Sequence, residues 1–267
     1  MIAEDARPSA HGRESQPGPG TMPDAVCTKV VDAPAGAIGR LAGGQAAAGL
    51  EGGVERAAAA LKPRMRGWLH AGVFPLALFG GVVLIAVSRS AAAVAACSVY
   101  VVSACLLFGT SAVYHRGTWG PRGEAVLRRL DHANIFLIIA GTYTPLAVLL
   151  LPADRQLVLL ALVWAGALAG VAFRLLWIGA PRWLYTPCYI ALGWVAVFDL
   201  PDFARTGGTA VVVLVIAGGL LYTAGAVVYG LKRPDPSPAW FGFHEVFHAL
   251  TIAAFTAHYT AILLAAT

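Results

Sequence analysis

The sequence predicts an all-α fold, a seven-transmembrane helix bundle. Of its 267 residues, 58% are hydrophobic and only 12% are charged, and the mean hydropathy is +0.70. A soluble domain carries roughly 25% charged residues, so this composition excludes an ordinary water-soluble protein. Beyond residue 60 the chain divides into apolar runs that approach the roughly 20 residues a helix needs to cross a bilayer.

Short breaks rich in proline, glycine or charge separate these runs and leave no room for a soluble domain between them. Inside the third run, Pro145 is expected to kink the helix. We expect the seven spans over residues 68–87, 91–113, 131–151, 156–177, 183–200, 208–231 and 243–266.

Residues 1–60 have a different composition, rich in Ala, Gly and Pro, and contain no long apolar run. They predict a flexible cytoplasmic tail, with residues 61–267 forming the transmembrane domain. The first twenty residues are mainly polar or Pro and Gly, so we expect no cleavable signal peptide and insertion through the first span.

The placement of lysine and arginine predicts the orientation, because these residues concentrate in cytoplasmic loops. The other side of the expected bundle has only Arg89, Arg155 and Arg205. The N-terminus is therefore expected in the cytoplasm and the C-terminus outside, in a multi-pass protein of the cell (plasma) membrane. The richer side carries Lys62, Arg64, Arg66, Arg116, Arg122, Arg128, Arg129, Arg174, Arg182, Lys232 and Arg233.

The charge pattern argues against a nucleic-acid partner, and the cysteine pattern argues against disulfides and thiolate metal sites. The net charge of +5 lies in short clusters between apolar runs, so nucleic acid is not an expected partner. The four cysteines form no C-x-x-C pair, and three of them fall in apolar runs, so we expect buried thiols without disulfides or thiolate metal sites. Membrane lipid is the expected substrate or ligand, and the sequence contains no signal for an oligomeric state.

Polar residues converge at the cytoplasmic ends of three predicted helices. His244 and His248 are four residues apart and share one helix face, about 6 Å from each other. With His115 at the end of the second span they supply three imidazoles, the usual number of protein ligands at a catalytic zinc site. Asp131 at the start of the third span and Ser111 are expected beside the metal, where they would hold water or orient a ligand.

Each of these residues also has a simpler interpretation. Polar groups at helix ends can reach the interface, and Asp131 could serve as the N-cap of its helix. Convergence of the set favours a site, because ionisable groups within spans are costly and mark function. Structural roles are expected for His258, about 15 Å beyond His248 along the same helix, and for Asp199 and Asp202; His70 and His132 are left undecided.

The string from His244 to His248 reads H-E-x-x-H, the zincin protease pattern in which Glu245 would be the general base. The longer form with a third downstream histidine is absent. A third ligand from upstream, His115, favours a metal site inside the bundle, with Glu245 as base left open.

Four segments, 111–115, 130–136, 140–145 and 242–248, resemble the hemolysin III family, a bacterial branch of the progestin and adipoQ receptor superfamily. The resemblance covers residue 61 to the C-terminus. It implies seven helices, a cytoplasmic N-terminus and zinc held by His115, His244 and His248, with Ser111 and Asp131 beside it. Many relatives carry a Glu-x-x-Asn signature before the first helix, where this chain has residues 64–70, RMRGWLH.

Related eukaryotic members resemble ceramide amidases, so the resemblance favours a zinc-dependent hydrolase of lipid amides or esters, with Asp131, Ser111 and Glu245 as candidate catalytic residues. The alternative is a non-enzymatic protein of membrane homeostasis or signalling, or a cytolytic, hemolysin-like protein. In that case the zinc would be structural.

Overall fold

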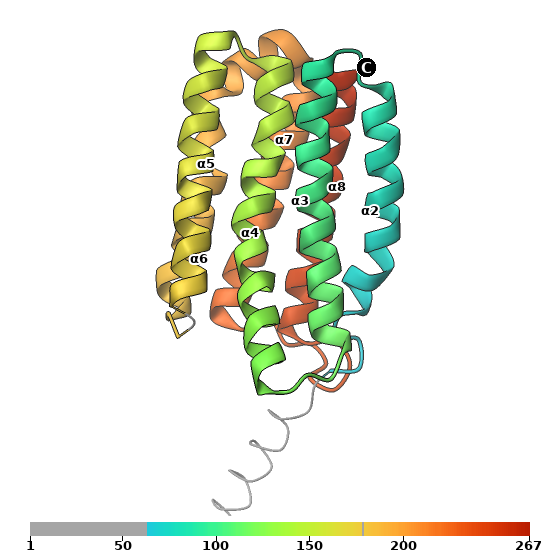
Figure 1. Ribbon diagram of the computed structural model, residues 1–267, viewed down its shortest axis with the longest axis vertical. Helices are drawn as coiled ribbons and strands as arrows, with labels where there is room; N and C mark the ends of the chain where they lie inside the picture. The colour runs from blue at the N-terminus through green and yellow to red at the C-terminus, as the bar shows by residue number, and fades with distance from the viewer. Residues whose placement is uncertain (1–62, 178) are drawn as a thin grey trace, which may run out of the picture. The chain divides into compact units, whose positions relative to one another are not determined.

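The computed structural model describes residues 63–177 and 179–267. The predictions for the tail, for Lys62 and for Cys27 lie outside these residues. The described part is all-helical, with one isolated bridge between Ser237 and Phe241 and no strand (Figure 1). The elements are α2 (Trp68–Val87), α3 (Ala91–Arg116), α4 (Pro121–Leu150), α5 (Ala153–Leu176), α6 (Arg182–Gly193), the 3-10 helix η1 (Val195–Asp199), α7 (Leu200–Leu231) and α8 (Phe243–Ala266).

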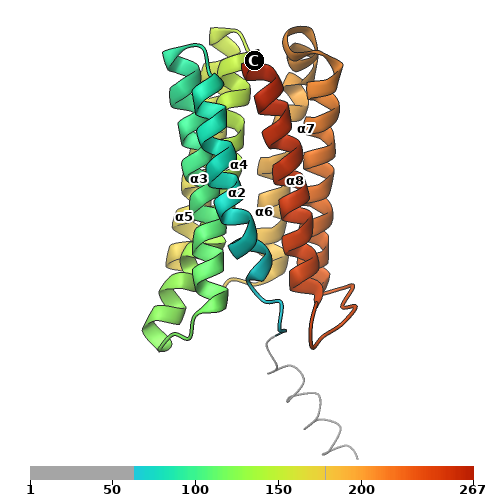
Figure 2. The same cartoon turned by 90° about the vertical axis from the view of Figure 1, so that its right-hand side faces the viewer.

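Six helical segments of the described chain are long and apolar enough to cross a membrane. Five of them are α2, α3, α4, α5 and α8, and the sixth is the continuous 50-residue segment Arg182–Leu231. Within that segment α6 and α7 are separate rods (Figure 2). Arg182 at the start of α6 donates to the carbonyl of Tyr229 near the end of α7 at 3.1 Å, so the two helices run antiparallel. The all-α membrane fold is confirmed, whereas seven crossings stay a prediction.

Hydropathy located some helix ends well and others poorly. The bounds of α2 and α8 coincide with the first and last predicted spans. The prediction that Asp131 opens or caps its helix was wrong, because α4 begins at Pro121. Proline is favoured at a helix start and Glu124 complements the first turn, so the helix begins before the apolar run does.

Gly208 marks a second difference. The sixth span was predicted to begin there, but α7 begins at Leu200 and contains a break at Gly208, whose φ is 78°. This left-handed conformation favours glycine. The helical turn before the break follows directly from η1.

The turns divide between two ends of the bundle. Residues 88–90 and 151–152 lie at the end that holds the C-terminus, and residues 117–120, 179–181 and 232–242 lie at the opposite end, which we call the arginine-rich end (Figures 1 and 2). The described members of the two groups of Lys and Arg separated in the sequence therefore lie toward opposite ends of the bundle. At the C-terminal end Asp199 pairs with Arg155 at 2.7 Å and Asp202 with Arg205 at 2.6 Å.

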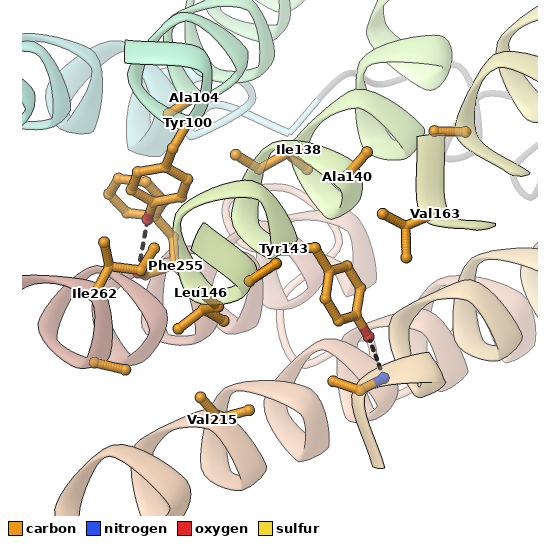
Figure 3. Close-up of a cluster of buried hydrophobic side chains, with 14 of the residues drawn as sticks. Tyr100, Ala104, Ile138, Ala140, Tyr143, Leu146, Val163, Val215, Phe255 and Ile262 are labelled. Atoms are coloured by element: carbon orange, nitrogen blue, oxygen red, sulfur yellow. Dashed lines mark hydrogen bonds between the residues drawn. The ribbon is translucent and has the colours of Figure 1, made fainter. Parts of the chain in front are cut away.

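The core is mainly apolar, and tyrosines such as Tyr100 and Tyr143 bring hydroxyl groups into it (Figure 3). The hydroxyl of Tyr143 donates to the carbonyl of Gly193 at 2.6 Å and accepts from the amide of Ala196 at 3.0 Å. It thus ties α4 to the junction of α6 and η1, whose backbone groups have no partner in a continuous helix. The described cysteines Cys97, Cys105 and Cys188 are free thiols, but the prediction that they are buried holds only for Cys97, because Cys105 is half-buried and Cys188 is exposed.

Candidate metal centre

Three histidines from two helices meet at the arginine-rich end. His115 lies in the last turn of α3, and His244 and His248 lie in the first turns of α8. All three side chains are buried, and one nitrogen of each lies within 4.8 Å of those of the others. The Nε2 atoms of His115 and His244 are 3.2 Å apart.

The separation of the His115 and His244 nitrogens fits a tetrahedral metal ion. Zinc–nitrogen bonds of 2.0–2.1 Å at a tetrahedral angle would separate two ligand nitrogens by about 3.3 Å. Neutral imidazoles are common zinc ligands, and a carboxylate lies on one side of the set, with Oδ2 of Asp131 3.8 Å from Nε2 of His115. The donor set is therefore suited to zinc.

Asp131 and Ser111 lie close to the histidines. Asp131 is carried by the part of α4 that extends beyond the apolar core, and Ser111 lies one turn before His115 on α3. The buried Ser111 hydroxyl lies near the Asp131 carboxylate without a regular hydrogen bond to it. Both groups line the same cavity as His248.

Glu245 faces a different set of groups. Its side chain is buried and pairs with Nε of Arg66, and its Oε2 accepts from the amide of Gly242 at 2.9 Å, which caps α8. Both oxygens are thus engaged away from the three histidines. These contacts favour a structural role over that of a general base.

His70 was left undecided from the sequence, and the structure brings it into the site. Its ring stacks on that of His248, with centroids 3.8 Å apart and an interplanar angle of 13°, and meets Phe108 edge-on. Neither ring nitrogen has a hydrogen-bond partner. A buried histidine in an otherwise apolar first span was the available signal. His258 lies apart, with Nε2 3.2 Å from the carbonyl of Val215.

The chain before α2 approaches the site closely. Gly67 has φ of 80°, and a Cβ placed on it would lie 2.7 Å from Cβ of His115. Only glycine combines this left-handed backbone with so close a passage. The turn from Gly67 into α2 therefore fixes the position of His70 and packs against His115.

His132 takes part in a polar network beside Asp131. Its Nδ1 donates to the carbonyl of Arg128 at 2.8 Å, so its Nε2 accepts from the hydroxyl of Tyr229 at 2.9 Å. The Tyr229 hydroxyl in turn lies 3.3 Å from that of Tyr185. Since Nδ1 of His132 is also 3.7 Å from Oδ2 of Asp131, this network forms one wall of the site.

An apolar cavity of about 120 Å³ extends from this centre into the bundle. His70, Ser111, Asp131 and His248 line one part of it, and His258 lines it ten residues farther along α8, a rise of about 15 Å. Most of the remaining wall is aliphatic or aromatic, from α4, α6, α7 and α8. A long, narrow apolar space with polar groups near one end suits an extended hydrocarbon chain.

Comparisons with known proteins agree with the resemblance. The chain is 36% identical over 141 residues to Hemolysin-3 of Bacillus cereus, which covers 52% of this chain and 64% of that protein, slightly under two thirds of its length. It is 31% identical over 148 residues to the Hemolysin-3 homolog of Bacillus subtilis (strain 168), covering 55% and 68%. The family profile described as "Haemolysin-III related" matches residues 58–259. The chain therefore belongs to the Haemolysin-III related family of membrane proteins.

Proposed function

We propose that this protein is a zinc-dependent hydrolase that cleaves an amide or ester bond of a membrane lipid. The observation that carries the proposal is the cluster of three buried histidine nitrogens beside a carboxylate, at one end of an apolar cavity. A metal site alone would fit a structural role. Here His248 lines the same apolar cavity as Asp131 and Ser111, and this cavity would take the lipid chain.

The proposal includes a topology of seven crossings in the cell membrane. Residues 182–231 would cross twice, because 50 residues form a helix of about 75 Å if continuous, whereas the bilayer core is about 30 Å. The arginine-rich end would face the cytoplasm. The site would then lie near the cytoplasmic leaflet, with the N-terminus inside and the C-terminus outside.

Each residue of the site would have a separate role in the proposed reaction. His115, His244 and His248 would hold the ion, and His70 fixes the ring plane of His248 by stacking. When bound, zinc supplies Lewis acidity toward a carbonyl oxygen and toward water. Asp131 accepts a proton from the attacking water and delivers it to the leaving nitrogen or oxygen, as the new carbon–oxygen bond forms and the scissile bond breaks. Ser111 orients the Asp131 carboxylate.

The test combines metal analysis with lipid hydrolysis. Protein purified in mild detergent should contain zinc at near one ion per chain and should release fatty acid from a lipid amide or ester. The His248→Ala variant should lose both properties, and Asp131→Asn should lose hydrolysis but keep the metal. Protein that contains no zinc would refute this proposal and the zincin protease interpretation together.

A second candidate follows from the names of the two relatives, Hemolysin-3 and Hemolysin-3 homolog. In this alternative the protein permeabilises membranes and the zinc is structural. Purified protein would then release a trapped dye from liposomes without hydrolysing their lipids. Leakage that persisted in Asp131→Asn would favour this function over hydrolysis.

A further inference from the structure

Arg174, in the last turn of α5, is a buried guanidinium without a counter-ion. The residue is only 3% exposed, and its Nε and Nη1 atoms have no hydrogen-bond partner. No carboxylate of the described residues lies within ion-pair distance of it. Its one close partner is the ring of Tyr185, 4.3 Å from the guanidinium carbon. A cation–π contact offsets only part of the cost of burying a charge.

A second arginine with no carboxylate partner among the described residues adjoins the same group of side chains. The guanidinium carbon of Arg182 lies 4.4 Å from the centre of the Tyr229 ring. By contrast, Arg66, Arg155 and Arg205 each pair with an acid. We call Arg174 and Arg182 the arginine cluster.

The arginine cluster is connected to the candidate metal centre through Tyr229. The ring of Tyr229 lies 6.0 Å from that of His244. Its hydroxyl donates to Nε2 of His132 and lies 3.3 Å from the hydroxyl of Tyr185. Tyr229 and Thr186 both line the cavity, and the buried hydroxyl of Thr186 has no partner. A ligand in the cavity would touch His248 at one place and, at another, the wall of Thr186 and Tyr229 that Arg182 packs behind.

We propose that Arg174, with Arg182, binds the phosphate of a phospholipid. A phosphate oxygen pair matches the planar fork of a guanidinium, and basic pockets between membrane helices bind anionic headgroups. As a statement about the substrate this rests on the proposed function: the phosphate is held at the arginine cluster while the scissile bond lies at the histidines. The proposal of a phosphate-binding site does not depend on that function, because it is argued from the unpaired guanidinium of Arg174.

The experiment measures lipid binding by the full-length protein in detergent. Thermal stabilisation is titrated with a short-chain phosphatidylglycerol and, for comparison, with a short-chain diacylglycerol that lacks phosphate. Arg174→Gln should weaken binding of the phospholipid by about tenfold or more, the loss expected for a charged hydrogen bond, and should leave diacylglycerol binding unchanged. Arg122→Gln is the matched control, because it removes the same charge from an exposed position at the start of α4.

Further measurements distinguish a phospholipid from free phosphate as the ligand, and the phosphate site from the proposed hydrolase. Inorganic phosphate that competes with the phospholipid supports recognition of the phosphate group itself, whereas phosphate binding without phospholipid binding overturns the lipid assignment. Equal affinities in Arg174→Gln and Arg122→Gln overturn the site. If Arg174→Gln does not fold, Arg174→Lys keeps the charge without the fork and should still bind more weakly than wild type. Arg174-dependent phospholipid binding that persists in His248→Ala, although zinc and hydrolysis are lost, supports the phosphate site independently of the hydrolase. Wild-type protein that binds the phospholipid but contains no zinc refutes the hydrolase alone.

Discussion

Replacing Glu245 distinguishes a structural carboxylate from a catalytic one. The side chain is fully buried, caps α8 through Gly242 and pairs with Arg66. Glu245→Gln keeps an oxygen for the cap but removes the charge that balances Arg66. Breaking a buried pair costs about 3–5 kcal/mol. Since the Arg66 side chain is 21% exposed and regains some water, we expect about 2–3 kcal/mol, a fall in melting temperature of about 5–10 °C for a domain of this size.

The assay is thermal unfolding of the purified protein in detergent, followed by tryptophan fluorescence. Arg66→Gln should destabilise by a similar amount, and the double variant should cost less than the sum of the two, because the pair is coupled. Zinc content should be retained in every folded variant. A Glu245→Gln protein that melts like wild type but no longer hydrolyses lipid would refute this reasoning and restore Glu245 as the general base.

Three further predictions concern the metal centre and the glycine that packs against it. Gly67→Ala should destabilise by about 1–3 kcal/mol and reduce zinc content, because its Cβ would lie 2.7 Å from Cβ of His115; Gly72→Ala, where nothing lies within 4 Å, should be neutral or stabilising in thermal melts. Chelation should lower the melting temperature of wild type, since zinc at a hundred times its Kd stabilises by about 2.7 kcal/mol, and should not affect His248→Ala. Asp131→Asn should lower kcat for lipid hydrolysis by about 10²–10⁴-fold at unchanged zinc content.

The helices were predictable from the sequence to the extent that hydropathy coincides with helix ends. In α2 and α8 the apolar run and the helix have the same bounds. In α4 they do not, because Arg128 and Arg129 interrupt the apolar pattern while arginine remains a good helix former. Hydropathy locates the part of a helix that lies in the bilayer, whereas helix-start residues such as Pro121 locate the end of the helix itself.

The three histidines could be found from the sequence because two independent patterns agreed. The spacing of His244 and His248 fixed one helix face, and the lysine and arginine counts brought His115 to the same end. His70 offered no such pairing, since its contact with His248 depends on how α2 packs against α8. Arg174 was counted only as a positive charge, because nothing in the sequence tells a buried guanidinium from one that reaches the surface.

The role of Glu245 shows why a local motif cannot decide a mechanism. H-E-x-x-H places the glutamate beside two potential ligands, but its function depends on the group opposite it. Here that group is Arg66, 179 residues away in the chain. Arg66 neutralises Glu245 and leaves Asp131 as the carboxylate near the three histidines. The motif supplies two ligand positions, whereas the partner that the chain before α2 brings to Glu245 decides what the glutamate does.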